Sequence, residues 1–233
     1  MIGIIGAMDI EVDGLKHIMT DKTEEKISGI TFTRGRIGGK ECVVTKCGIG
    51  KVNAAVAAQT MILRYSPEKL INTGIGGSTS LDTHIGSVVI AKDVIQHDVD
   101  TTIIGDKPCE LFLPEGSIIY IPCDTELINE LRAACDSLGA ESMIGTVATG
   151  DQFISGNDKR LSLHERLGAI ACEMEGGSIG QVCYLNNVPF AVLRSISDSM
   201  SDEDDSVEYS VFRRSSAENS INILITFLSA DKD

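Results

Sequence analysis

Two short apolar runs separated by one helix-length segment set the strongest limit on how this chain can fold. The runs cover residues 169–172 and 190–196, and Ile179, Val182 and Cys183 lie at helical spacing between them. A strand, a helix and a second strand in this order favour parallel pairing, with helices covering the faces of the sheet. Because strands and helices alternate in this way throughout the second half of the chain, the sequence predicts an α/β fold.

Charged side chains accompany both apolar runs. Glu173 and Glu175 follow the first run, Arg194 lies inside the second, and Asp198 lies just beyond it. Ligands of α/β sheets bind outside the carboxyl ends of the strands, and a charged group is costly to bury unless it is paired or used. Two interpretations follow: a buried ion pair of Arg194 with Glu175 or Asp198, or a site that holds a polar small molecule.

Glu11 is predicted to lie at the same edge of the sheet. Residues 2–5 form an apolar run that ends at Gly6, which indicates a buried first strand. Asp9 is a suitable N-cap for a helix over residues 9–19. Glu11 would then lie in the first helical turn, next to the carboxyl end of the strand. The alternative is a Glu that faces solvent and stabilises the helix dipole.

A hairpin in the first half predicts that the sheet is mixed. Residues 30–37 and 41–47 are apolar or alternating, with two glycines and a lysine between them. Further strands are predicted at residues 70–73, 85–94, 118–121 and 144–148, a long loop at 101–116, and helices from residue 51 to before Pro67 and at 125–138, 161–167 and 207–228. We therefore expect one domain over residues 1–233, a three-layer sandwich in which helices flank a mixed, mostly parallel central sheet.

Three short motifs contain parts of known ligand-binding signatures. Gly48-Ile-Gly-Lys51 opens a helix but lacks the first Gly and the Ser or Thr of a P-loop. The glycine-rich segment from Gly74 to Ser78 follows a strand with no helix directly after it, so it lacks the context of a dinucleotide site. His97, Asp98 and Asp100 are metal-ligand types, but one cluster without a second His motif is more typical of a hydrogen-bonded strand end. We expect no metal site.

Charge and cysteine content exclude several classes of protein. The chain has 20 Lys and Arg against 34 Asp and Glu, a net charge of −14 that repels a phosphate backbone and argues against nucleic-acid binding. Its seven cysteines are odd in number and form no Cys-x-x-Cys pair, which is typical of free thiols in a reducing compartment. There is no signal-peptide pattern, and no apolar run reaches the roughly 18–20 residues that span a bilayer. We expect a cytoplasmic protein without a membrane partner.

Seven motifs occur in one order along nearly the whole chain. They are Gly3-Ile-Ile-Gly-Ala-Met-x-x-Glu11, Gly48-Ile-Gly-Lys51, Asn72-Thr-Gly74, His97-Asp-x-Asp100, Gly150-Asp-x-Phe-Ile154, Glu173-Met-Glu175 and Arg194-Ser-Ile-Ser-Asp198. In this register the chain resembles the 5′-methylthioadenosine/S-adenosylhomocysteine nucleosidases of the purine nucleoside phosphorylase superfamily. The resemblance implies a nucleoside phosphorylase-like fold and a homodimeric hydrolase without a cofactor. Such an enzyme cuts the N-glycosidic bond of 5′-thioadenosine nucleosides and releases adenine and a thioribose.

The resemblance also implies a role for each matched residue. Asp198 would be the general acid that protonates adenine N7, Glu11 the base that activates water, and Glu175 the group that holds the ribose hydroxyls. The other substrate-binding residues that it implies are Met8, Ile49, Ile75, Phe153, Ile154, Glu173, Met174, Arg194, Ser197 and Tyr209. Among these, the Phe153 ring would stack on adenine, and the backbone of Ile154 would read the edge of the base. A partner-subunit loop between Thr101 and Ile104 would close the 5′ pocket.

The chain departs from the family pattern at three places. Ile75 follows Asn-Thr-Gly where the family usually has a Ser, so Ser78 or a shifted water would have to compensate, or the activity or substrate range would differ. Gly176 and Gly177 follow Glu175 where Ala-Thr is common, which would loosen the start of the helix. The segment before Tyr209 is about one residue longer than usual, which affects where Tyr209 lies.

Three other functions stay open on the sequence. A phosphorylase of the same superfamily needs cations for phosphate, and the glycine-rich motifs offer only Lys51. A hydrolase of futalosine or another purine nucleoside is favoured by Ile75, which alters the ribose side of the pocket. A non-catalytic nucleoside-binding protein would not need an acid and a base together, so the joint presence of Glu11, Glu175 and Asp198 argues against it.

Overall fold

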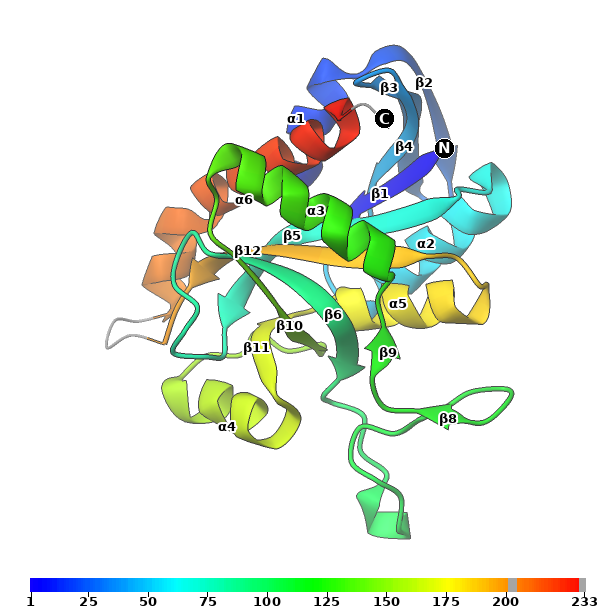
Figure 1. Cartoon of the computed structure of the whole chain (residues 1–233). Helices are drawn as coiled ribbons and strands as arrows, with labels where there is room; N and C mark the ends of the chain where they lie inside the picture. Colours follow the sequence, from blue (N-terminus) through cyan, green and yellow to red (C-terminus); the bar gives the residue numbers. More distant parts are fainter. Residues whose placement is uncertain (201–204, 231–233) are drawn as a thin grey trace.

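Helices cover both faces of a central sheet in this protein (Figure 1). We describe it from a computed structural model, which covers residues 1–200 and 205–230. The strands are β1 (Ile2–Gly6), β2 (Thr20–Ile27), β3 (Ile30–Ile37), β4 (Lys40–Lys46), β5 (Lys69–Ser78), β6 (Val88–Gln96), β7 (Leu111–Phe112), β8 (Ser117–Ile118), β9 (Ile121–Pro122), β10 (Ser142–Thr149), β11 (Ala169–Glu173) and β12 (Phe190–Asp198). The helices are α1 (Asp9–Ile18), α2 (Lys51–Tyr65), the short η1 (Thr102–Ile104), α3 (Thr125–Leu138), α4 (Asn157–Leu167), α5 (Gly176–Leu185) and α6 (Asp205–Ser229).

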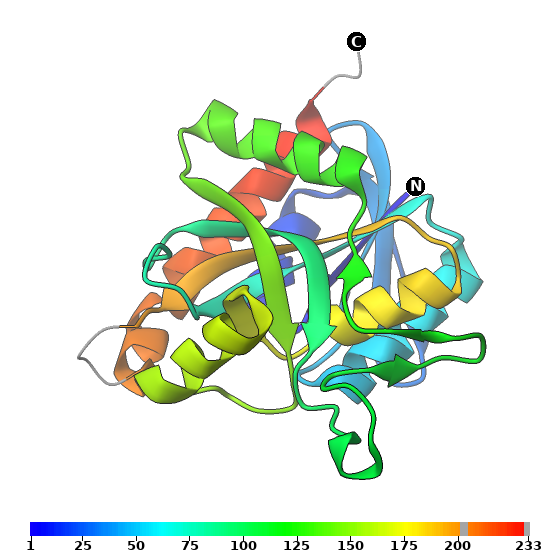
Figure 2. The same ribbon diagram turned by 60° about the horizontal axis from the view of Figure 1, so that its bottom comes forward.

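The predicted three-layer sandwich is confirmed. Helices α1, α3 and α6 pack on one face of the sheet, and α2 and α5 pack together on the other. Helix α4 lies at the edge, against β10 and β11 (Figure 2). Within the described part of the chain, no helix combines the length and the apolarity that crossing a bilayer requires.

The sheet is mixed, and five of its strands close into a ring. The strand order is β11-β10-β6-β12-β5-β1-β4-β3-β2. Strand β11 also pairs with β5, with Cys172 opposite Gly77, so β5, β12, β6, β10 and β11 each have two neighbours within the ring. The β5–β11 and β6–β12 pairs are antiparallel, so antiparallel pairing is more extensive than the sequence predicted.

Most predicted elements are present, and two differ for identifiable reasons. The segment from Gly74 to Ser78, predicted as a loop, continues strand β5, whose residues after Lys69 are all buried. Strand β2 was not predicted because its residues are nearly all polar and exposed, without an apolar face. The hairpin of β3 and β4 and helix α3 occur as predicted, with the Asp124 carboxylate accepting the Leu127 backbone N–H at 2.9 Å.

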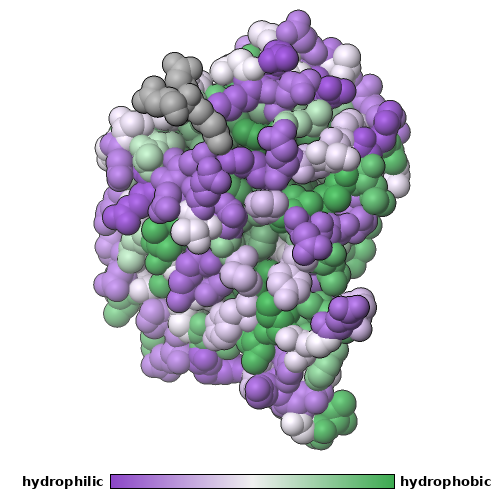
Figure 3. Space-filling model, turned by 45° about the vertical axis from the view of Figure 1, so that its right-hand side comes forward, coloured by the Kyte–Doolittle hydropathy of each residue, from purple (hydrophilic) through white to green (hydrophobic). Residues whose placement is uncertain are grey.

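The segment predicted as a long loop at residues 101–116 contains the short helix η1 and strand β7, which pairs with β8 as a two-stranded arm. Helix η1 lies at the bottom of the molecule in Figures 1 and 2, away from the sheet. Its Ile103 and Ile104 side chains are 95% and 77% exposed. The space-filling view shows hydrophobic residues at this lower tip (Figure 3).

Candidate active site

One pocket gathers most of the predicted site residues at the carboxyl ends of β1, β5, β11 and β12. The residues that line it are Ala7, Met8, Glu11, Ile49, Ile75, Gly76, Gly77, Phe153, Cys172, Glu173, Met174, Glu175, Ser197, Asp198 and Tyr209. All the predicted residues are among them except Ile154 and Arg194. The cavity measures about 80 Å³, which is small for a nucleoside. A nucleoside could therefore bind only if side chains at the rim moved apart.

Glu11 is fixed by the backbone around it. Its Oε2 accepts the N–H groups of Ala7 and Met8 at 2.7 and 2.9 Å, and its Oε1 accepts that of Ile75 at 3.1 Å. The side chain is 3% exposed, so the interpretation of a Glu facing solvent is wrong. Burial raises the pKa of the Glu11 carboxyl, while Arg194 and the three N–H groups act in the opposite direction. The predicted cap was also wrong, because Met8 is the N-cap and Asp9 is the first helical residue.

The glycines of β5 make room for this carboxylate. A Cβ at Gly74 would lie 2.6 Å from Glu11 Oε1, closer than any side chain permits. Next to it, Ile75 contributes its backbone N–H to Glu11 and its side chain to the pocket wall. Ser78 does not replace the missing hydroxyl, because its Oγ donates to Ser80 O at 2.7 Å and also bonds to the Thr83 hydroxyl.

Arg194 pairs with Glu173, and not with Glu175 or Asp198 as the ion-pair interpretation assumed. The guanidinium Nη2 contacts both Glu173 Oε2 and Asn72 Oδ1, and Nη1 donates to Leu193 O at 2.9 Å. Arg194 is 1% exposed and is absent from the residues that line the pocket. It therefore lies behind the pocket wall, where its charge acts on Glu11 and Glu175 through space.

Glu175 is a second buried carboxylate with a raised pKa. Its Oε1 accepts the Gly50 N–H at 2.8 Å, at the start of α2. Burial first, and the neighbouring Glu173 charge second, raise the pKa of Glu175 to about 8, against the lowering effect of Arg194. Burial thus favours the neutral form of this carboxyl until a positive charge develops beside it.

Gly176 and Gly177 do not loosen the start of α5, contrary to expectation. The Gly176 N–H donates to Glu173 Oε2 at 2.7 Å, and the Gly177 N–H donates to Thr149 Oγ1 at 2.6 Å. A Cβ at Gly177 would lie 2.9 Å from the side chains of Gln96 and Thr149. The helix begins tightly packed against β10 and β6, and a side chain at Gly177 would force these neighbours to shift.

Asp198 is held by two side chains. Ser197 Oγ donates to its Oδ1 at 2.6 Å, and Arg160 Nη2 forms an ion pair with its Oδ2. Arg160 comes from α4, is fully buried, and was not found by sequence reasoning. No signal could have found it, because an Arg in a polar helix is ordinarily exposed.

Apolar side chains form the rim of the pocket. The Phe153 and Tyr209 rings meet edge to face with their centroids 5.4 Å apart, and the Tyr209 hydroxyl lies 3.6 Å from Met8 Sδ. Phe153 and Ile49 are 49% and 53% exposed, as expected of side chains that a ligand or a second subunit covers. Tyr209 thus lies at the pocket despite the longer segment before it, of which residues 201–204 lie outside the described part of the chain.

The His97-Asp-x-Asp100 motif is used in hydrogen bonds. Asp98 binds Lys51 Nζ at 2.6 Å and the Asp151 N–H at 2.9 Å, and Asp100 accepts the Thr102 N–H at 2.9 Å. These bonds join the start of α2 to the segment that carries Phe153. Among the described residues, no group of three or more His, Cys, Asp or Glu side chains is placed to hold a metal ion.

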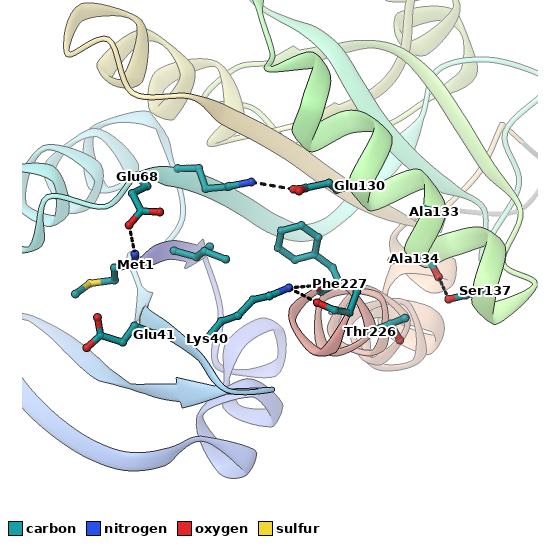
Figure 4. A pocket seen from close by; sticks show the side chains of 13 residues that line it. Met1, Lys40, Glu41, Glu68, Glu130, Ala133, Ala134, Ser137, Thr226 and Phe227 are labelled. Atoms are coloured by element: carbon teal, nitrogen blue, oxygen red, sulfur yellow. Dashed lines mark hydrogen bonds and ion pairs between the residues drawn. The ribbon is translucent and has the colours of Figure 1, made fainter. Parts of the chain in front are cut away.

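A larger cavity, of about 570 Å³, lies elsewhere, between α3, α6 and the start of β1 (Figure 4). Its charged groups are already paired: Lys69 with Glu130 at 2.9 Å, and the N-terminal amine with Glu68 at 2.8 Å. Lys40 Nζ donates to the carbonyls of Phe227 and Ala230. The smaller pocket is the better candidate site, because buried carboxylates from separate elements converge there at the carboxyl ends of the strands.

Comparison with known proteins gives one consistent result. The model of the phosphorylase superfamily matches residues 1–229. A 5′-methylthioadenosine/S-adenosylhomocysteine nucleosidase of Shewanella sediminis is 38% identical over 97% of this chain and 98% of that protein. A Helicobacter pylori nucleosidase, solved as an Asp-to-Asn variant with 5′-methylthioadenosine in the active site, is 32% identical with a TM-score of 0.90, covering 97% of this chain and 96% of that one. A futalosine hydrolase of the same organism has the same identity and coverage and a TM-score of 0.89.

Proposed function

This chain belongs to the 5′-methylthioadenosine/S-adenosylhomocysteine nucleosidases of the phosphorylase superfamily, and we propose that its pocket hydrolyses the N-glycosidic bond of these two nucleosides. The observation that carries the proposal is the convergence of Glu11, Glu175 and Asp198, from three distant parts of the sequence, in one pocket. Glycosidic hydrolysis uses an acid and a base, and a third carboxylate can stabilise the positive charge that develops on the sugar. The products are adenine and a 5-thioribose.

Asp198 is the general acid in this proposal. Adenine leaves poorly as an anion, so N7 takes the proton of the Asp198 carboxyl while the electrons of the C1′–N9 bond pass into the base. The Ser197 hydroxyl contacts the same carboxylate and orients it. Phe153 stacks on the adenine ring, and the Ile154 backbone reads its edge.

Glu175 and Glu11 act on the sugar and the water. The sugar becomes oxocarbenium-like as the bond breaks, and its positive charge favours the ionised form of Glu175, which stabilises it while holding the ribose hydroxyls. Water attacks C1′ from the face opposite adenine and gives its proton to Glu11. An acid on one face and a base on the other is the logic of an inverting glycosidase.

The rim fits the 5′ substituent. Met8, Ile49 and Tyr209 present apolar surface and a thioether, which suit a 5′-thio group. Met174 packs under the ribose, and Ile75 closes the wall where other family members carry a hydroxyl. The charged pair of Glu173 and Arg194 supports this wall from behind.

The pocket supports phosphorolysis less well than hydrolysis. Within the described part of the chain, the residues that line the pocket include neither Lys nor Arg. Lys51, the cation of the glycine-rich motif, is bound to Asp98. A phosphate dianion would therefore meet carboxylates without a cation to pair with.

Hydrolysis of futalosine is the second candidate. Ile75 lines the pocket, and the solved futalosine hydrolase is as similar to this chain as the solved nucleosidase. Relative kcat/KM for futalosine and 5′-methylthioadenosine would separate the two. A futalosine preference would move the proposal to that substrate without changing the roles of the three carboxylates.

We also propose a cytoplasmic homodimer in which the partner's loop between Thr101 and Ile104 covers the 5′ side of the pocket. The exposed Ile103 and Ile104 side chains, and the exposed Ile49 at the pocket rim, support it. All seven cysteines are free and buried, which suits a reducing compartment. Light scattering at several concentrations tests the dimer, and an Ile103→Asp variant that stays dimeric contradicts the role of this loop.

Release of adenine from 5′-methylthioadenosine, measured with and without inorganic phosphate, tests the main proposal. We expect turnover at the same rate in both conditions. Strict phosphate dependence would indicate a phosphorylase. Binding of the nucleoside without release of adenine would indicate a non-catalytic binding protein.

A further inference from the structure

Arg160 is the one cation in direct contact with the proposed acid in the described structure. We propose that Arg160 is a positioning residue for Asp198: it aims the carboxyl at the base and couples it to the segment that carries Phe153. This inference rests on the proposed function, because it assumes that Asp198 protonates adenine.

The guanidinium is fixed by more than the ion pair. Arg160 Nη1 donates to Ser78 O at 2.9 Å and to Asp198 O at 3.2 Å, while Nη2 contacts Asp198 Oδ2. Arg160 is fully buried and Asp198 is 2% exposed. The guanidinium thus holds the backbone carbonyl and the side chain of Asp198 at once, which restricts the rotation of the carboxylate.

Glycine in β5 permits this arrangement. A Cβ at Gly77 would lie 2.8 Å from Asp198 Oδ2 and 3.1 Å from Arg160 Nη1. The carboxylate and the guanidinium therefore lie directly over the Gly77 backbone. The remaining carboxylate oxygen, Oδ1, is bound by Ser197, so both oxygens are held by named donors.

Arg160 also connects the acid to the base-binding segment. Its backbone N–H bonds to Gly156 O at 3.2 Å, in the first turn of α4, and that helix begins directly after the segment containing Phe153. If binding of a base against Phe153 moves this segment, the Arg160 side chain would transmit the movement to Asp198. Phe153 and the arginine that holds the acid thus belong to one continuous segment of chain.

The charge of Arg160 gives the arrangement a chemical effect as well. A guanidinium favours the ionised form of a neighbouring carboxyl. Once N7 has taken the proton, the Asp198 anion remains in a buried site, and Arg160 stabilises it there.

Few other charges face Asp198 from the described elements around it. Strand β5 contributes glycines and the Ser78 carbonyl, and α6 contributes the Tyr209 hydroxyl, with Arg213 beside that ring. Glu11 lies across the pocket, on α1. Replacing Arg160 therefore removes the only opposite charge in contact with Asp198 among these groups.

Separate measurement of kcat and KM for adenine release tests the proposal in Arg160→Gln and Arg160→Lys. We expect Arg160→Gln to lower kcat by about 10²-fold, because a misaimed catalytic group costs that much, with a much smaller change in KM. Arg160→Lys should recover part of kcat, because it restores the charge without the forked geometry.

Arg166→Gln is the matched control, since Arg166 is an exposed arginine of the same helix. It should leave kcat and KM unchanged. Equal losses of kcat and of melting temperature in both Arg160 variants, with no rescue by Lys, would overturn the proposal and leave Arg160 a structural residue. If Arg160→Gln does not fold, wild-type kcat in Arg160→Lys contradicts the role of the guanidinium fork. A wild type that releases no adenine contradicts the proposed function instead.

Discussion

The two sides of the pocket hold their carboxylates by different means. On the proposed sugar side, Glu11 is bound by three backbone N–H groups and Glu175 by one. On the base side, Asp198 is bound by the side chains of Ser197 and Arg160. Backbone donors bring no net charge, so burial dominates and the pKa values of Glu11 and Glu175 are raised. The Arg160 guanidinium brings a full positive charge, so the electrostatic environment of Asp198 depends on a side chain that a single substitution can remove.

Asp198→Asn should have the largest effect, because it removes the proposed general acid on the base side. We expect kcat to fall by about 10⁴-fold, at the upper end of what one general acid contributes. Nucleoside binding, measured by calorimetry, should persist because Asn keeps the shape and an acceptor oxygen. Unimpaired turnover of Asp198→Asn would show that the general acid does not lie on this side of the pocket.

Glu11→Gln should follow, with a loss in kcat of about 10³-fold. The amide oxygen can still accept backbone hydrogen bonds, but Gln cannot take a proton from water. Because both carboxylate oxygens accept backbone N–H groups, the amide nitrogen of Gln would leave one of them unsatisfied, at a cost of about 1–3 kcal/mol of unfolding free energy. A loss of folding with no specific loss of kcat would show that Glu11 is a structural group.

Glu173→Gln probes the charge behind the pocket. It leaves the buried Arg194 without its anionic partner, and breaking a buried pair in this way costs about 3–5 kcal/mol of unfolding free energy. Urea denaturation gives the value. Lys69→Gln, which breaks a more exposed pair with Glu130, should lower the unfolding free energy much less. Equal losses in the two variants would contradict the view that Glu173 and Arg194 form a rigid support.

Gly74→Ala tests the backbone cradle of Glu11 without changing a charged residue. The added methyl would lie 2.6 Å from Glu11 Oε1, and forcing one methyl into a packed site costs about 1–3 kcal/mol. We expect kcat to fall with the stability, because Glu11 is displaced. Gly14→Ala, which meets only the Ile221 side chain at 3.1 Å, is the control and should leave kcat intact.

The pH dependence of stability tests the raised pKa of Glu175. Because the pKa of Glu175 is raised from 4.5 to about 8, the native state binds one more proton than the unfolded state between these values. Unfolding free energy should therefore decrease as the pH rises through this range, with Glu175 contributing up to about 1.4 kcal/mol per pH unit. Glu175→Gln should flatten the slope of unfolding free energy against pH. If the slope does not change, it arises from other groups, such as Glu11.

The sequence predicted the layers of this fold better than the details of its sheet. Alternating apolar runs and helical patterns predict three layers, because those patterns reflect burial. The end of β5 could not be predicted, since glycines there indicate a loop, and their real cause is the carboxylate of Glu11 and the ion pair of Asp198 lying against them. The ring closure depends on pairing between β5 and β11, which are distant in sequence.

For the site, strand ends and motifs placed Glu11, Glu175 and Asp198 together, and the structure brings them into one pocket. The sequence patterns could not identify the partner of Arg194. Glu173 and Glu175 are two residues apart, and only the turn after β11 decides which of the two faces Arg194. The patterns could not identify Arg160 either. Its burial arises from the packing of α4 against the sheet edge, which leaves no pattern in the sequence of the helix.

The closed ring of strands has a consequence for how this pocket could acquire new substrates. The strands behind the carboxylates each have a neighbour on both sides, so a substitution there disturbs several pairings at once. The rim is built from Met8, Ile49, Phe153 and Tyr209, side chains that are at least partly exposed and free of ladder constraints. Variation selected for a different 5′ group should therefore accumulate at the rim, while the hydrolytic floor stays the same.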